Sequence, residues 1–357
     1  MSKFPKLFIP GPTHVSDEIL EAFHTPQIGH RTPEISELIS EIVRGVQDLL
    51  YTKNNIYLVS HPATGLWEMG IRNCVKKKVL HCVNGAFSKK WVKVSECVGV
   101  EYDVIEYEWG KSVKAEDIQS KLNEGHYDAV ALVHNETSTG VMSDLEKIGD
   151  MMKNFPDTCL LVDAVSSMAG VKIEVDSCGI DFIMASTQKA WGLPAGFSIA
   201  CVSDKFIEKS SEIINKGYIL DIFTYEKYYS KNQTPYTPSI PHLFGLQKVL
   251  HLIKKEGLEN RWRRHKEMAT FTREWAISKG QSLYAEKGFE SETVTSIRNE
   301  MNWDINKLND MLLLKGFRMD RGYGSLRGKV FRISHMGNIH MEDLEEYLEK
   351  FEECLNV

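Results

Sequence analysis

The chain has 357 residues, enough for one large domain and a smaller one. Its hydrophobic content of 42% and charged content of 26% are ordinary for a soluble globular enzyme. The net charge of −6 argues against a general affinity for nucleic acid or anionic membranes. No segment approaches the roughly 18 apolar residues that a membrane-spanning helix needs, and the start does not read as a secretory leader. We therefore expect a cytoplasmic protein with neither a membrane nor a nucleic-acid partner.

The seven cysteines are scattered along the chain. No CxxC pair and no His/Cys spacing typical of a metal site occurs. Two of them, Cys159 and Cys201, lie within apolar runs, where a thiol is usually buried. The pattern predicts free thiols in a reducing compartment and no metal site.

From about residue 55, short apolar runs alternate with helical patterns. Helices are expected from Thr64 onward and over residues 87–97, and strands over 56–59, 79–83, 100–107, 128–133, 159–162, 182–185 and 197–202. Strands that alternate with helices indicate βαβ units, whose parallel sheet is covered on both faces. The predicted fold class is α/β, with a mainly parallel seven-stranded sheet in a large domain.

The pattern changes in the last third of the chain. Residues 225–236 are rich in Tyr, Lys, Asn, Gln and Pro without a clean period, which predicts a long loop. Helices then follow to about residue 279, and the basic cluster 261–266 is expected to be a solvated helix face because the overall charge does not support a nucleic-acid footprint. We predict an N-terminal segment (1–15), a large domain (16–250) and a smaller α+β C-terminal domain (251–357).

Two residues at predicted strand ends carry most of the functional argument. Asp163 ends the run Leu160-Leu161-Val162, and Lys189 follows the next run by a few residues. Pyridoxal 5′-phosphate (PLP) needs a lysine for its Schiff base and an acid for its pyridine nitrogen. Taken alone, Lys189 would be a surface lysine and Asp163 an ordinary helix cap. Their spacing of about one βα unit favours the cofactor site.

Other strand ends offer the remaining contacts that such a cofactor needs. Ala63 and Thr64 lie at a strand-to-helix junction, where N–H groups can bind phosphate; an ordinary turn is the alternative. Phe87 could stack on the pyridine ring or belong to the core. The hydroxyl groups of residues 137–139 could bond the ring oxygen or cap a turn.

Arg332 alternates with apolar residues in the strand-like run Val330-Phe331-Arg332-Ile333. A guanidinium in such surroundings requires a carboxylate partner. An internal salt bridge would satisfy it, and so would the α-carboxylate of an amino-acid substrate. The second alternative is the one that fits a PLP enzyme.

In this order and spacing, these stretches resemble the class V aminotransferases of PLP fold type I, close to the alanine–glyoxylate and serine–pyruvate (serine–glyoxylate) branch. The resemblance covers nearly the whole chain. It is carried by the segments 8–13, 29–34, 84–87, 134–140, 161–166, 186–189, 234–241 and 328–333.

The resemblance implies a role for each matching residue. Lys189 would be the Schiff-base lysine and Asp163 the pyridinium partner. The remaining cofactor contacts would be Ala63, Thr64, Phe87, Thr137, Val165 and Gln188. Tyr236 and Ser239 would reach the phosphate of a neighbouring subunit, which implies a homodimer with shared sites, and Arg332 would bind the substrate carboxylate.

The chain departs from the family pattern in one place that matters. The phosphate loop is usually rich in glycine and serine, whereas here it reads His61-Pro62-Ala63, and proline removes an N–H donor. Ser239, where threonine is common, is a milder change. The phosphate contacts are therefore expected to differ from the usual ones.

The activity that the resemblance implies is a ping-pong transamination from alanine or serine to glyoxylate or pyruvate, with ureidoglycine as another candidate donor. A cysteine desulfurase-type lyase is an alternative on the same fold. Those enzymes usually carry histidine before the lysine, where this chain has Gln188. A non-catalytic homologue is disfavoured by Lys189 and Arg332, and a dehydrogenase by the lack of a GxGxxG motif after the first strand.

Overall fold

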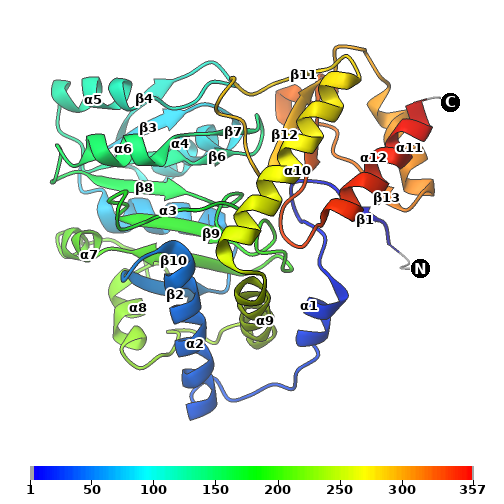
Figure 1. Ribbon diagram of the computed structural model, residues 1–357. Helices are drawn as coiled ribbons and strands as arrows, with labels where there is room; N and C mark the ends of the chain where they lie inside the picture. The colour runs from blue at the N-terminus through cyan, green and yellow to red at the C-terminus, as the bar shows by residue number, and fades with distance from the viewer. Residues whose placement is uncertain (1–3, 356–357) are drawn as a thin grey trace.

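The computed structural model describes residues 4–355, and its centre is a sheet of seven strands (Figure 1). Their order across the sheet is β2 (Asn55–Val59), β10 (Ser198–Val202), β9 (Phe182–Ser186), β8 (Cys159–Asp163), β5 (Ala129–Val133), β3 (Lys78–Val83) and β4 (Glu101–Glu106). Only β10 runs antiparallel to its neighbours, β2 and β9. The mainly parallel seven-stranded sheet is therefore confirmed.

Helices cover both faces of this sheet, because successive strand residues face opposite sides. In β8, Leu160 and Val162 pack on one side, and Cys159 and Leu161 on the other. The first side is covered by α2 (Pro33–Leu50), α5 (Ala115–Glu124), α6 (Leu145–Met152) and α9 (Ile240–Glu256). The second is covered by α3 (Ala63–Cys74), α4 (Ala86–Val98), α7 (Asp204–Ser210) and α8 (Ile222–Tyr229).

The helix α8 overturns part of the predicted loop over residues 225–236. Asp221 caps this helix by accepting a hydrogen bond from the Phe223 N–H at 3.0 Å. Tyr225 is buried against the sheet-covering cluster, which gives the short helix an apolar anchor. Eight residues are too few to show a clear helical period in the sequence, so the tyrosines there resemble loop composition.

The C-terminal part forms a smaller α+β layer on one side of the large domain (Figure 1). It contains α10 (Leu258–Ser278), β11 (Ser282–Leu283), β12 (Val294–Arg298), α11 (Ile305–Leu314), β13 (Phe317–Arg318), β14 (Val330–Ser334) and α12 (Met341–Leu355). The N-terminal strand β1 (Lys6–Leu7) pairs in parallel with β13. Phe8, which follows β1, packs in the apolar cluster formed by the C-terminal helices and strands. The domain limits at residues 15 and 250 stay predictions; α9, which crosses the second, runs on to Glu256.

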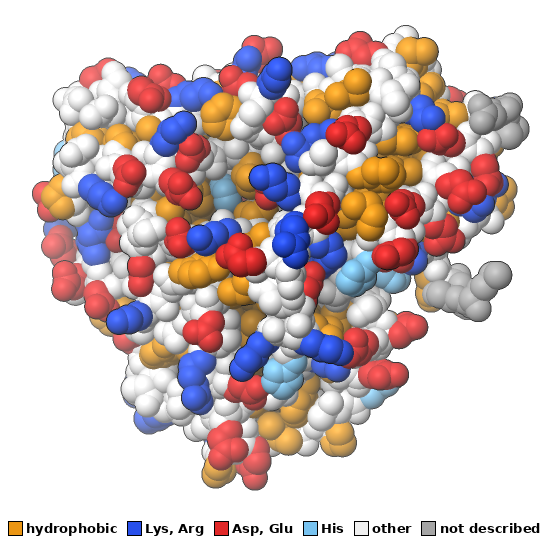
Figure 2. All heavy atoms as spheres, in the orientation of Figure 1, with side chains coloured by type: hydrophobic (Ala, Val, Ile, Leu, Met, Phe, Trp, Pro, Cys, Tyr) orange, Lys and Arg blue, Asp and Glu red, His pale blue; other side chains and the backbone are white. Residues whose placement is uncertain are grey.

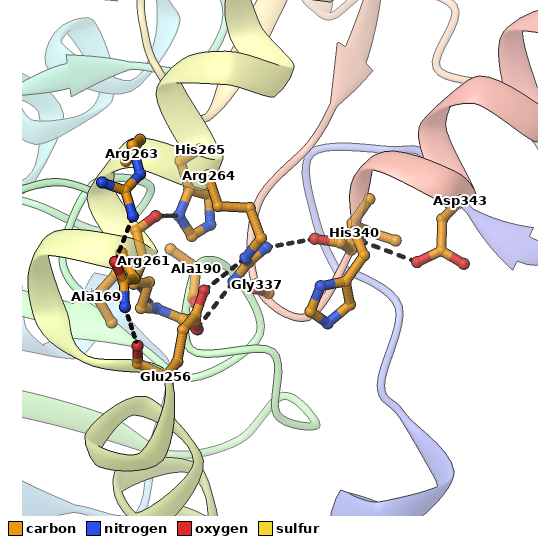
Figure 3. Close-up of polar contacts among 12 residues, drawn as sticks. Ala169, Ala190, Glu256, Arg261, Arg263, Arg264, His265, Gly337, His340 and Asp343 are labelled. Carbon is orange, nitrogen blue, oxygen red and sulfur yellow. Dashed lines mark hydrogen bonds and ion pairs between the residues drawn. The ribbon is translucent and has the colours of Figure 1, made fainter.

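The basic cluster 261–266 is not the solvated face that its composition suggested. Arg261 and His265 are buried, while Arg263 and Lys266 are exposed. Figure 3 shows the Arg261 guanidinium directed at backbone and carboxylate oxygens: it donates to the carbonyls of Ala169 at 2.7 Å and Ala190 at 2.9 Å. A buried guanidinium is stable only when its N–H groups have such acceptors, which composition cannot reveal.

The surface has no single-sign character in the view of Figure 2, where acidic and basic side chains are interspersed. None of the helices between residues 4 and 355 is both long and apolar enough to span a bilayer.

Candidate active site

Lys189 and Asp163 come together at the carboxyl edge of the sheet. Strands β8 and β9 are parallel neighbours, with Asp163 opposite Met184, and Lys189 follows the end of β9 by three residues. This edge is where open α/β sheets bind their ligands. Burial lowers the pKa of Lys189 to about 8, and the positive charge of Arg332 adds to the effect, while Asp163 and Asp320 oppose it. A neutral amine is therefore accessible near physiological pH.

The N-terminal segment closes over this lysine. The Lys189 Nζ donates to the carbonyl of Pro10, and the Lys189 carbonyl accepts from the Thr13 hydroxyl at 3.0 Å. At Gly11, φ is +145°, a conformation that strains any residue with a Cβ, and a Cβ there would lie 2.2 Å from the Lys189 Nζ. The sequence motif 8–13 is thus part of the site, although its residue types gave no hint of a contact with the lysine.

Asp163 is a buried carboxylate held by neutral donors. Its Oδ1 accepts from the Val165 N–H and its Oδ2 from the Trp67 indole Nε1, both at 2.8 Å. Burial raises its pKa to about 7 in spite of these two hydrogen bonds. No cationic side chain of residues 4–355 is bound directly to the Asp163 carboxylate. The protonated ring nitrogen of PLP would supply that cation, so the residues present fit the cofactor.

Glu136 and its neighbours position the residues predicted to face the ring. The carboxylate of Glu136, which is completely buried, accepts from the N–H groups of Phe87 at 3.1 Å and Ser88 at 3.0 Å. It thereby ties the first turn of α4, and with it Phe87, to the loop that carries Thr137. The Thr137 hydroxyl donates to the Ser166 hydroxyl at 2.7 Å.

The predicted phosphate contacts surround the beginning of α3. Ala63 and Thr64 are its first two residues, whose N–H groups have no acceptor within the helix. His61 Nε2, just ahead of this helix, and Gln188 Oε1, next to Lys189 in the chain, are buried atoms with no hydrogen-bond partner among the described residues. The free N–H groups at the start of α3 are what a phosphate site offers before its ligand binds.

Within one chain, Ser239 contacts a residue just ahead of α3, whereas Tyr236 contacts other tyrosines. The Ser239 N–H donates to the Ser60 hydroxyl at 2.9 Å, just ahead of α3. Tyr236 donates its hydroxyl to the Tyr218 carbonyl at 2.7 Å and packs edge-on against Tyr225. Their predicted reach to a partner subunit stays a prediction.

Arg332 lies in β14, is buried, and already has a carboxylate partner. Its Nε and Nη2 donate to the two oxygens of Asp320 at 2.7 and 2.8 Å, and its Nη1 donates to the Thr137 carbonyl at 2.8 Å. The internal salt bridge that the sequence left open is therefore present. A guanidinium carries five N–H groups, so two remain for a substrate carboxylate.

Tyr323 completes the surroundings of Phe87 and Arg332, and the sequence gave no reason to select it. Its ring stacks on Phe87 with centroids 5.1 Å apart, and the Arg332 Cζ lies 5.7 Å from its centre. Asp320, Glu136 and Trp67 were missed for the same reason: each acts through a contact that is distant in sequence. No cluster of three or more metal-ligating side chains occurs among residues 4–355.

The known proteins most like this chain in sequence and fold include several aminotransferases. The family model described as Aminotransferase class-V matches residues 21–300. An uncharacterised aminotransferase of Methanocaldococcus jannaschii is 36% identical over 93% of this chain and 87% of its own length. The L-aspartate–glyoxylate aminotransferase of Paracoccus denitrificans is 32% identical over 93% of this chain and 86% of its own length.

A crystal structure of alanine–glyoxylate aminotransferase from Nostoc sp. superposes with a TM-score of 0.93 at 30% identity, covering 99% of this chain and 96% of that one. The resemblance to PLP fold type I enzymes is therefore confirmed, and the desulfurase-type and dehydrogenase alternatives are not favoured. The chain belongs to the class V aminotransferases, and it is a PLP-dependent enzyme.

Proposed function

We propose that this aminotransferase moves the amino group of a small amino acid, alanine or serine, to glyoxylate or pyruvate by a ping-pong mechanism. What supports the proposal most is that Lys189 and Asp163 lie at one edge of the large sheet, and that the charge of Arg332, from β14, acts on Lys189. Lys189 would bind the amine, Asp163 the ring nitrogen and Arg332 the carboxylate. Relatives with glyoxylate in their names support the acceptor. The (S)-ureidoglycine–glyoxylate transaminase of Bacillus subtilis, 27% identical, keeps ureidoglycine as an alternative donor.

When bound, PLP supplies a carbonyl for exchange between amines and an electron sink for the substrate Cα. Lys189, with its lowered pKa, would hold the cofactor and then carry the proton that leaves Cα. Asp163 would keep the ring nitrogen protonated. The backbone at Pro10 and Gly11 contacts the Lys189 amine and would limit the access of water from that side.

The other predicted contacts would fix the cofactor in place. Phe87 and Val165 would pack on the ring, and the Thr137 hydroxyl would bond the ring oxygen. Ala63, Thr64 and Gln188 would bind the phosphate, the first two through the free N–H groups at the start of α3 and Gln188 through its side-chain NH2 group. Arg332 would bind the substrate carboxylate through the N–H groups that Asp320 and Thr137 leave available.

A homodimer in the cytoplasm with a role in amino-acid metabolism also belongs to this proposal. Tyr236 and Ser239 would contribute to the phosphate site of the partner subunit. The support is the position of Ser239 beside Ser60, at the edge of the phosphate site in its own chain.

The visible absorption spectrum of the holoenzyme, recorded with a panel of amino donors, tests the proposal. Alanine or serine should bleach the band of the bound cofactor, and glyoxylate or pyruvate should restore it. The matching 2-oxo acid should be formed in equal amount. If only ureidoglycine bleaches the band, ureidoglycine is the donor and the proposed alanine or serine is wrong. If no amine bleaches it, the protein is not a transaminase.

A further inference from the structure

Two stacked tryptophans lie behind the cofactor site, and only one of them contacts a catalytic group. Trp67, in the second turn of α3, and Trp91 of α4 have ring centroids 6.1 Å apart and nearly parallel planes. Both are buried. The Trp91 Nε1 donates to the Trp67 backbone carbonyl at 3.3 Å, whereas the Trp67 Nε1 donates to Asp163 Oδ2 at 2.8 Å. The pair therefore differs in acceptor: a carbonyl for one, a carboxylate for the other.

The indole of Trp67 is the one side-chain donor to Asp163 among the described residues, the other donor being the Val165 N–H. Both are neutral, and both stabilise the ionised carboxylate against the cost of burial, which has raised its pKa to about 7. A carboxylate has about four lone-pair positions, so two remain for a ring nitrogen.

The basicity of Asp163 decides where the proton between it and a pyridine nitrogen resides. If the carboxylate were the stronger base, the proton would move to Asp163 and the ring would become neutral. A neutral ring is a poorer electron sink, and a neutral pair binds less tightly than an ion pair. Each hydrogen bond to the charged carboxylate lowers its basicity and opposes this transfer.

We propose that Trp67 is a positioning residue that acts through Asp163: its indole N–H keeps the carboxylate a weaker base than the ring nitrogen, so that the ring stays protonated. The inference rests on the proposed role of Asp163 and goes beyond it. It assigns to a core residue of α3 a share in the electronic state of the cofactor.

The test compares Trp67→Phe with Trp91→Phe in the holoenzyme. Each change removes one buried indole N–H from the same stacked pair, but only the first removes a donor to Asp163. For Trp67→Phe we expect the PLP dissociation constant of the apoenzyme to rise about tenfold or more. Nitrogen-15 NMR of cofactor labelled at the ring nitrogen should move at neutral pH from the pyridinium toward the neutral-pyridine shift. Trp91→Phe should leave both values near those of the wild type.

Equal effects of the two substitutions, or an unchanged ring-nitrogen shift in Trp67→Phe, would overturn the inference. The variant Asp163→Asn distinguishes a failure of this inference from a failure of the proposed function. If Asp163→Asn changes neither readout, the role of Asp163 itself fails. If it changes both while Trp67→Phe changes neither, only the role of Trp67 fails.

A measurement on the unmutated sequence covers the case in which Trp67→Phe does not fold. In the apoenzyme with nitrogen-15-labelled indoles, one indole N–H signal should titrate with the ionisation of Asp163, near pH 7. The same signal should stop titrating in Asp163→Asn. If no indole signal titrates in the wild type, the contact does not sense the charge of Asp163 and the inference is wrong.

Discussion

At the scale of single residues, the site contains ionisable groups whose pKa values are shifted by the fold. Lys189 is the clearest case, because burial and the nearby Arg332 lower its pKa to about 8 while the N-terminal backbone covers it. Asp163 shows the opposite shift for the same reason, the loss of water around a charge. The two shifts bring the lysine and the acid close to one another in proton affinity.

We expect the capture of PLP by the apoenzyme to depend on pH through Lys189. Only the neutral amine attacks the carbonyl, so the rate constant should rise about tenfold per pH unit below pH 8 and level off above it. Stopped-flow absorbance measures this rate. Lys189→Ala should show no covalent capture and no turnover, and wild-type turnover in that variant would contradict the assignment of the lysine.

Arg332 leads to a prediction about substrate binding. Arg332→Ala removes charge-assisted hydrogen bonds to the substrate carboxylate, so kcat/KM for α-amino acids should fall by about a hundredfold or more. Arg327→Ala, an exposed arginine of the preceding turn, is the matched control and should change little. Steady-state kinetics with alanine and serine give both values. Equal kcat/KM in Arg332→Ala and the wild type would leave Arg332 only its internal salt bridge with Asp320.

At the scale of elements, the site is built by contacts between segments far apart in the sequence. Glu136 follows β5, yet it satisfies the first N–H groups of α4, some fifty residues earlier. Gly85 allows this approach, since a Cβ there would lie 2.4 Å from the Glu136 Cγ. The acid also lies at the N-terminus of α4, where negative charge is favoured.

We expect Glu136→Ala to destabilise the protein by about 3 kcal/mol, because it leaves buried N–H groups of α4 without an acceptor. Glu136→Gln, which keeps one acceptor oxygen, should cost less. Chemical unfolding of the apoenzyme measures both, with the exposed Glu146→Ala of α6 as the control. If Glu136→Ala has the same free energy of unfolding as this control, the contact of Glu136 with α4 does not contribute to stability.

The sequence predicts those parts of the molecule that local patterns encode. Apolar runs locate the seven strands, and strand ends locate Asp163 and Lys189, because both depend on nearby residues only. The buried Arg261, the reversed direction of β10 and the Trp67–Asp163 contact depend on tertiary partners. Trp67 in particular sits among apolar helix residues, where a core position is the natural interpretation.

At the scale of the whole molecule, the two layers meet next to Lys189. Arg261 of α10 donates to the carbonyl of Ala190, the residue after Lys189, and forms an ion pair with Glu256 at the end of α9 (Figure 3). Arg264, one turn along the same helix, bonds Glu256 and the carbonyl of Gly337 in the turn after β14. The helix that connects the layers thus also holds the backbone around Lys189 and the strand that carries Arg332.

Through the buried Asp163, the stability of the fold would also depend on the supply of its cofactor. In the cofactor-free fold the pKa of Asp163 is about 7, above its ordinary 3.8, so the folded state binds a proton that the unfolded state releases. The contribution of Asp163 to the stability of the apoenzyme should therefore fall as pH rises from about 4 to about 7, and stay lower above that. The protonated ring nitrogen of bound PLP would pair with the ionised Asp163 and so offset this loss of stability. The difference in melting temperature between holoenzyme and apoenzyme should widen from pH 5 to pH 8, and a gap that stays constant would contradict this. Cells short of vitamin B6 would then lose the protein itself as well as its activity.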